Sequence, residues 1–190
     1  MFACAVDWPG WCRIGKDEAT ALELLAQTAP RFAAVAAVAG LEFPSRELQF
    51  NVVDRVEGSV ATDFGAPSAI TAADTRPFDA DDAARSVALL RASWKLLDSV
   101  AASAPSELRK GPRGGGRDTT PIVEHVQSSE CAYGRRIGIR DKPADLRPLF
   151  LERLATDFDV PAKGWPGRYA ARRIIWHVVD HIWEIQDKSS

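Results

Sequence analysis

The chain has 190 residues, 46% of them hydrophobic and 26% charged, which is the composition of a globular protein with a sizeable core. Its 24 basic and 26 acidic side chains leave a net charge of −2, so no overall field favours nucleic acid or anionic lipid. The sequence has no basic leader and no uncharged apolar run near the roughly 18 residues that span a membrane, so we expect a cytoplasmic protein with no membrane or nucleic-acid partner.

The three cysteines do not predict a disulfide framework. Cys4, Cys12 and Cys131 are an odd number at unrelated spacings, which suits a reducing compartment. Cys4 and Cys12 also lack a second close pair, which argues against a zinc ribbon.

Residues 1–75 are predicted to form a small α/β element. A short apolar run, the turn Asp7-Trp-Pro-Gly-Trp and a second extended run indicate an antiparallel hairpin. Asp17 can cap the helix that follows, and Pro30 and Gly40 punctuate the next segments. The expected elements are strands at 2–6 and 12–14, helices at 18–29 and 32–39, and a third strand at 48–57.

From Asp79 onward, the apolar residues recur at the three- and four-residue steps of amphipathic helices. Four helices are expected, at about 79–104, 119–137, 145–158 and 169–187, with the glycine-rich segment 110–118 as a solvated loop between the first two. The predicted fold is therefore α+β and mainly α, with a four-helix bundle at 78–190 preceded by the α/β element and its short antiparallel sheet.

The histidines are the strongest functional signal. The chain contains three, and His177 and His181 stand four residues apart in the last predicted helix, so both side chains lie on one helix face. His125 falls near the start of another helix, and bundles build metal sites from inward side chains on facing helices. All three occupy a border of their helix's apolar stripe. The sequence therefore predicts one divalent-metal site on His125, His177 and His181.

Two stretches carry a resemblance to a known family. Thr119-Thr-Pro-Ile-Val-Glu-His125-Val-Gln-Ser-Ser-Glu130-Cys-Ala-Tyr133 and Trp176-His177-Val-Val-Asp180-His181-Ile-Trp resemble the DinB-like metal-binding superfamily of four-helix bundles. The resemblance covers about residues 78–187 and implies zinc or nickel on the three histidines, with open positions for water or substrate. It also implies a transferase or isomerase that uses a low-molecular-weight thiol. Residues 1–75 depart from the family's usual layout.

Three further side chains are candidates for the chemistry of such an enzyme. Glu184 is nearly in line with His177 and His181, and Glu130 lies close to the middle of its helix's stripe, so either could carry protons. Arg136 lies near His125 on the helical wheel and could hold an anionic substrate. Glu130 could instead pair with an arginine of a neighbouring helix.

Other interpretations of the same residues remain. The sequence His177-Val-Val-Asp180-His181 is not expected to be an inverted zinc-hydrolase motif, because aspartate replaces glutamate and the chain ends soon afterwards. We expect Asp180 to orient a histidine ring or to pair with Arg172 or Arg173. In a non-catalytic alternative, Glu184 is a fourth ligand, the ion staples the bundle, and the α/β element binds a partner or forms a homodimer.

The N-terminal segment has a shorter resemblance of its own. The run Val6-Asp-Trp-Pro-Gly-Trp-Cys-Arg-Ile-Gly-Lys-Asp-Glu is similar to HicB-like small domains, in which a Pro-Gly hairpin precedes a helix. We do not expect an antitoxin role from it. Trp176 and Trp183 lie off the main apolar stripe of the last helix, which indicates a second contact surface, against this element or another subunit.

Overall fold

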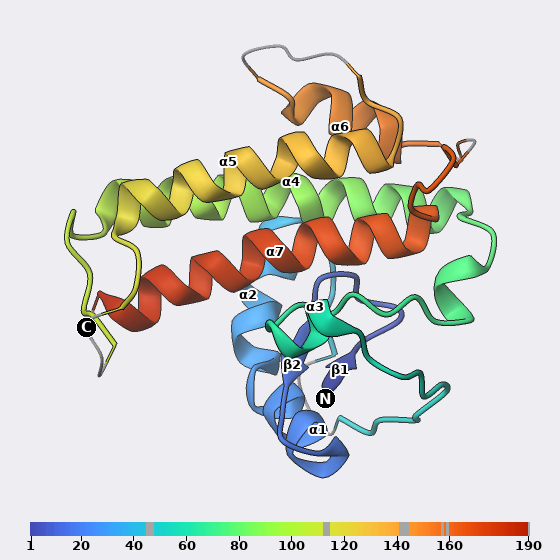
Figure 1. The fold of residues 1–190 in the computed structure, drawn as a ribbon, viewed down its shortest axis with the longest axis horizontal. Helices are drawn as coiled ribbons and strands as arrows, with labels where there is room; N and C mark the ends of the chain where they lie inside the picture. Colours follow the sequence, from blue (N-terminus) through green and yellow to red (C-terminus); the bar gives the residue numbers. More distant parts are fainter. Residues whose placement is uncertain (45–47, 112–114, 141–144, 157, 159, 190) are drawn as a thin grey trace.

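A computed structural model describes residues 1–44, 48–111, 115–140, 145–156, 158 and 160–189 (Figure 1). Within them the chain is mainly helical, with one small antiparallel sheet at its start, which confirms the predicted fold class. The elements are β1 (Phe2–Cys4), β2 (Cys12–Ile14), α1 (Glu18–Gln27), α2 (Ala29–Val38), α3 (Val60–Asp63), the 3₁₀ turn η1 (Ala73–Thr75), α4 (Ala80–Ser103), α5 (Thr119–Arg136), α6 (Arg147–Leu154) and α7 (Gly167–Lys188).

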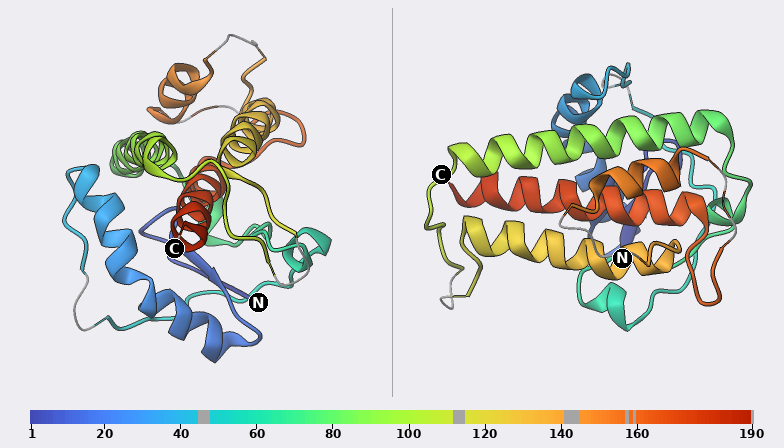
Figure 2. Two further views of the ribbon diagram at one scale, coloured as in Figure 1. Left: turned by 90° about the vertical axis from the view of Figure 1, so that its left-hand side faces the viewer. Right: turned by 90° about the horizontal axis from the view of Figure 1, so that it is seen from above.

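The four helices of the C-terminal part form the predicted bundle. Helices α4, α5 and α7 run along one another, and α6 lies across α4 and α5 on the side away from α7 (Figure 2). Helix α4 begins where expected, because the Asp79 side chain caps it by accepting a hydrogen bond from the backbone N–H of Asp82 at 2.9 Å. Helix α6 is shorter than the expected 145–158.

The N-terminal hairpin and helices cover the opposite side of α7. Trp176 and Trp183 of α7 are 6% and 4% exposed. Trp176 meets the ring of Phe2 edge to face at 6.0 Å, and the Arg13 guanidinium lies 3.9 Å from the centroid of the Trp183 ring. The second contact surface predicted for these tryptophans is therefore the surface of the N-terminal element.

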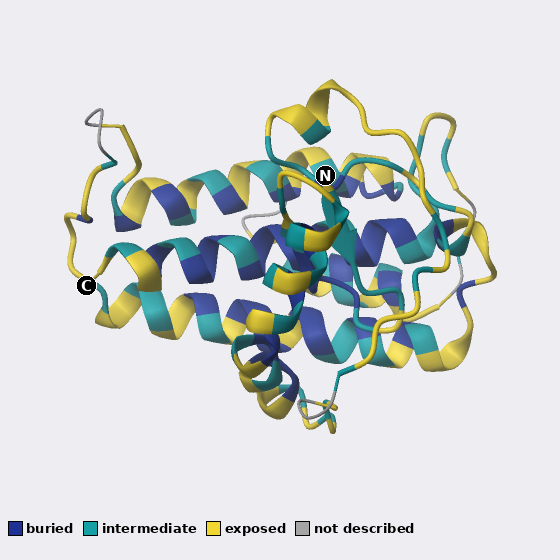
Figure 3. Cartoon of the chain, turned by 90° about the horizontal axis from the view of Figure 1, so that it is seen from below, coloured by how far each residue is buried: buried dark blue, intermediate teal, exposed yellow. Residues whose placement is uncertain are grey.

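Because it has neighbours on both sides, α7 is buried around most of its circumference (Figure 3). Its close fit to the hairpin depends on Gly10, which adopts a left-handed φ of +98°. A Cβ atom on Gly10 would lie 2.3 Å from Cγ2 of Ile175 on α7. Only glycine combines that backbone conformation with so close an approach.

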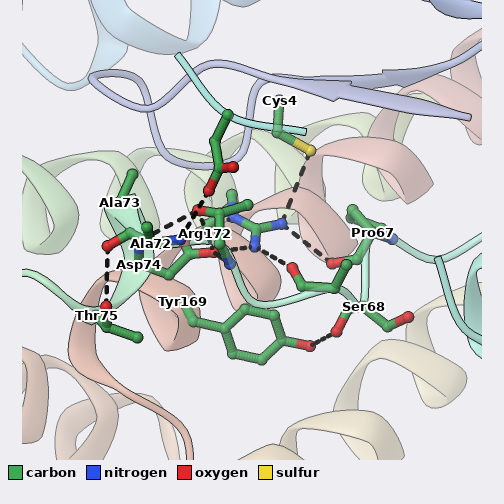
Figure 4. A network of polar contacts seen from close by, with 12 residues as sticks. Cys4, Pro67, Ser68, Ala72, Ala73, Asp74, Thr75, Tyr169 and Arg172 are labelled. Atoms are coloured by element: carbon green, nitrogen blue, oxygen red, sulfur yellow. Dashed lines mark hydrogen bonds and ion pairs between the residues drawn. The ribbon is translucent and has the colours of Figure 1, made fainter. Parts of the chain in front are cut away.

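A buried ion pair joins η1, in the segment between the N-terminal element and the bundle, to α7. Arg172 donates to Asp74 of η1 at 2.6 Å and to the backbone carbonyls of Pro67 and Ala69 at 3.1 and 2.9 Å (Figure 4). Both charged side chains are only 7% exposed. Charges buried this deeply are tolerated when nearly every donor and acceptor has a partner, as here.

The third strand predicted at 48–57 is wrong. Residues 48–58 have no regular secondary structure, and in the described residues the sheet consists of β1 and β2 alone. The segment is held by side chains instead, since Arg55 pairs with Glu18 of α1 and Asp54 accepts from the backbone N–H of Ala72. A run rich in Val and Phe favours a strand only where another strand offers its edge.

The glycine-rich segment 110–118, predicted as a solvated loop, is described only in part. Residues 112–114 lie outside the described residues, and Lys110 beside them pairs with Asp118. No helix among the described residues is both long and apolar enough to cross a membrane.

Candidate metal centre

Helix α7 supplies two of the three histidines. His177 and His181 are separated by about one helical turn in a helix that is continuous from Gly167 to Lys188, so their side chains leave the same face. They are 6% and 8% exposed. These two imidazoles are therefore held side by side in the interior.

Helix α5 brings the third histidine to them. It begins at Thr119, and Pro121 occupies the first turn, where its missing N–H costs no intrahelical hydrogen bond. His125 follows in the second turn and is partly exposed. Since α5 packs along α7, His125 faces the pair on α7, with its ring centroid 5.2 Å from His177 and 5.0 Å from His181.

The nitrogen atoms converge as metal ligands do. One ring nitrogen from each histidine lies within 4.8 Å of the other two. The Nε2 atoms of His125 and His177 are 3.3 Å apart. Two nitrogens on one tetrahedral ion, with bonds of about 2.0–2.1 Å, stand about 3.3 Å apart. The His125–His177 pair therefore has the spacing of two ligands on a small divalent ion such as zinc, and the three histidines form a group that could hold one.

Burial also keeps His177 and His125 in the neutral form that binds metals. Burial lowers the pKa of His177 to about 2, and charges on His181, Arg173, His125 and Arg117 act in the same direction. Burial likewise lowers the pKa of His125, with Arg117 and His181 contributing. Neither ring therefore has to lose a proton before it binds an ion near neutral pH.

Glu184 orients one of the rings. Its carboxylate lies 2.7 Å from Nδ1 of His181, and its other oxygen accepts from Lys188 at 2.5 Å. The hydrogen bonds from His181 and Lys188 lower the pKa of Glu184 to about 2, so it is ionised. A carboxylate on Nδ1–H leaves Nε2 of His181 free as a ligand atom, which is the usual outer partner of a metal-binding histidine.

Aromatic and basic side chains border the cluster on α5 and α7. Tyr133 meets the His177 ring edge to face at 5.4 Å. The guanidinium of Arg173 lies 5.4 Å from the Tyr133 ring and 4.7 Å from the Trp176 ring. The Arg173 Nη1 atom is buried and has no hydrogen-bond partner in the part of the chain that the structure describes. A buried donor without a partner is uncommon, and Arg173 lies one helical turn from His177.

The structure does not bring Glu130 to the histidines. Glu130 is 4% exposed and accepts a 2.5 Å hydrogen bond from Nε1 of Trp94 on α4. Five residues separate it from His125, which places it about 140° around α5. Its burial raises its pKa, against the hydrogen bond from Trp94 and the charge of Arg147. The predicted proton-transfer role gains no support from this position.

Arg136 is also remote from the cluster. It is the last residue of α5, and its Nη1 donates to the backbone carbonyl of Lys163 at 2.8 Å. Eleven residues separate it from His125, a rise of about 16 Å along a helix. The helical wheel placed both on one face because it ignores that rise.

Asp180 contacts the N-terminal hairpin, and three basic residues influence the histidine cluster. Asp180 pairs with Arg13 of β2 at 3.0 Å, so the expected pairing with Arg172 or Arg173 is wrong. Arg117, Arg173 and Lys188 influence the site and were not predicted. Spacing could have indicated two of them, since Arg173 is one turn before His177 and Lys188 one turn after Glu184.

No protein family, characterised protein or solved structure matches this chain in comparisons of its sequence and fold.

Proposed function

We propose that this protein binds one zinc or nickel ion on His125, His177 and His181 and acts as a metal-dependent transferase or isomerase on a low-molecular-weight thiol. The observation that carries the proposal is the convergence of three ring nitrogens within 4.8 Å, while Glu184 is engaged by His181 and Lys188. A centre with three protein ligands keeps a coordination position for a small molecule, as in catalytic zinc sites.

The bound ion would supply Lewis acidity, which lowers the pKa of a water or thiol that it coordinates. The protein's own residues do the rest. Glu184 holds His181 in one tautomer, and burial keeps His177 neutral. Tyr133 forms a wall beside His177, which limits the access of water from that side.

Arg173 replaces Arg136 as the proposed anion-binding residue. It is one turn from His177 on the same face of α7, and its Nη1 donor is buried and unpartnered among the described residues. Its charge is close enough to disfavour protonation of His177. A substrate or thiol cofactor that carries a carboxylate would satisfy this donor.

The non-catalytic alternative requires a closed coordination sphere. Glu184 is the acidic side chain that could close it, and it would first have to leave both His181 and Lys188. Structural zinc sites have four protein ligands. Because Glu184 is already held by His181 and Lys188, its position favours the enzyme over a binding or dimerisation module whose bundle is held together by the metal.

Cobalt-substituted protein gives the direct test. We expect a low-molecular-weight thiol to produce the near-ultraviolet absorption of a thiolate–cobalt bond. We also expect the metal-loaded protein to catalyse the reaction of that thiol with an added electrophile, measured as loss of free thiol. Arg173→Gln should weaken the binding of a thiol that carries a carboxylate by about tenfold or more and spare an uncharged thiol, because a charge-assisted hydrogen bond is worth about 1.5–3 kcal/mol. A cobalt spectrum unchanged by every thiol would contradict the proposal and favour the closed structural site.

A further inference from the structure

The hairpin holds two cysteines face to face. Cys4 of β1 and Cys12 of β2 are direct partners in the antiparallel register. Met1 and Gly15 exchange both backbone hydrogen bonds, at 2.7 and 2.9 Å. Because such pairs alternate, Cys4 and Cys12 form a non-hydrogen-bonded pair, in which Cα atoms are about 4.5 Å apart and side chains are closest. That separation lies within the range that a disulfide bridges.

The two thiols have different environments. Cys4 is partly exposed, whereas Cys12 is 1% exposed, and both are free thiols. The hydrogen bond that Cys12 donates lowers the pKa of Cys4, and the charge of Arg172 lowers it further. Burial raises the pKa of Cys12. Nη1 of Arg172 lies 3.7 Å from Sγ of Cys4, as the close view shows (Figure 4). Cys4 therefore has the character of an attacking thiolate, and Cys12 that of a second thiol held in reserve.

Cys4 also lines a cavity. This cavity has a volume of about 50 Å³ and is bordered by the charged side chains of Arg85, Arg168, Asp82 and Asp74. Arg172 lines it as well, beside apolar side chains such as Phe78 and Val6. Arg168 pairs with Asp82 and Arg172 with Asp74, so most of the charges offset one another. One water molecule needs about 10–15 Å³ of such space, so the cavity suits a small molecule the size of a few waters. Among oxidants of thiols, a small hydroperoxide meets that limit, whereas a bulky organic disulfide does not.

We propose that Cys4 and Cys12 are a redox-active pair that hydrogen peroxide, or another small hydroperoxide, converts to a disulfide through this cavity. The Cys4 thiolate attacks one peroxide oxygen. The S–O bond forms as the O–O bond breaks, giving a sulfenic acid and hydroxide. The Cys12 sulfur then attacks Cys4, the S–S bond forms, and the sulfenic oxygen leaves with the Cys12 proton as water. Two thiols are oxidised and one peroxide is reduced.

The protein contains its own control. Residues 1–13 contain no lysine or arginine before Arg13, so trypsin releases both cysteines in one peptide. Cys131 is exposed and lies in another peptide. After limiting peroxide, the first peptide should lose about 2 Da and resist alkylation. Its loss of thiol should be about tenfold faster than that of Cys131, because the thiolate is the reactive form.

Variants separate the steps. Cys131→Ser should leave the reaction unchanged, since the bridge forms within the hairpin. Cys12→Ser, or Cys12→Ala if serine is not tolerated in the core, should let a dimedone-type reagent trap the sulfenic acid on Cys4. If peroxide oxidises Cys131 while Cys4 and Cys12 of the wild-type protein stay open to alkylation, the proposal is overturned. It is equally overturned if the 1–13 peptide gains oxygen without losing 2 Da.

Discussion

At the scale of single residues, the metal centre depends on how its ligands are held. His181 presents one nitrogen because Glu184 occupies the other at 2.7 Å, and Lys188 holds Glu184 in turn. Outer partners of this kind affect affinity although they do not touch the ion. The site therefore extends one layer beyond its three ligands.

Replacing Glu184 tests whether this outer hydrogen-bond partner affects metal binding. We expect Glu184→Gln to weaken zinc binding about 10- to 100-fold, because a neutral amide orients and polarises the His181 ring less well than a carboxylate. Competition with a coloured chelator would measure the affinity. Glu152→Gln, an exposed position on α6, is the matched control and should bind zinc as the wild type does. Equal affinity in both variants would remove Glu184 from the account.

Glu130 gives a prediction about pH and stability. Burial raises its pKa above the ordinary 4.5, so the folded state binds this proton more tightly than the unfolded state. The contribution of Glu130 to the free energy of unfolding is therefore most favourable below pH 4.5, and it is lost as the pH rises through the raised pKa of the folded state. The free energy of unfolding, relative to Glu130→Gln, should fall by on the order of 1 kcal/mol and then level off. Urea titrations between pH 4 and 8 measure this, and a difference that grows with pH would contradict it.

The candidate site could be predicted only in part from the sequence. Spacing identifies His177 and His181, because four residues make one helical turn whatever the helix packs against. The structure brings His125 to them as expected. A helical wheel carries no axial information, however, so Arg136 was assigned to a site about three turns away. The Arg173 donor, which has no partner among the residues that the structure describes, follows from packing, which periodicity does not reveal.

At the scale of elements, the contact between the hairpin and α7 is the tightest requirement of the fold. Gly10→Ala should destabilise the protein by about 1–3 kcal/mol beyond the strain of its left-handed φ, because the new methyl group overlaps Ile175. Gly40 also has a positive φ, of +73°, but a Cβ atom there meets none of the described residues within 4 Å. Gly40→Ala therefore isolates the backbone strain. Urea denaturation of both variants tests this, and equal losses would show that the overlap is absorbed.

Elements were predicted well where one residue pattern decides them. The helical period gives the start of α4, and the Pro-Gly turn gives the hairpin. Residues 48–57 were mistaken for a strand because their Val and Phe content was not weighed against the lack of a partner edge. In α7, an amphipathic stripe describes one contact surface, but the helix has a second against the hairpin.

At the scale of the whole molecule, α7 belongs to both parts of the chain. The division into 1–75 and 78–190 stays a prediction, but the N-terminal element covers Trp176 and Trp183. A chain of residues 76–190 would expose both rings and lose Cys4 as a neighbour of Arg172. We expect it to keep helical far-ultraviolet dichroism, lose near-ultraviolet signal and bind a hydrophobic dye. Cooperative unfolding at the full chain's midpoint would show that the bundle stands alone.

The three histidines remain the central claim, and metal content tests them most directly. The protein would be purified without a histidine tag, beside His177→Ala prepared in the same way, and both analysed for bound metals. We predict about one equivalent of zinc or nickel in the wild type and its loss in the variant, because two remaining imidazoles hold an ion weakly. A wild-type protein that holds no metal even after dialysis against zinc or nickel would contradict the account.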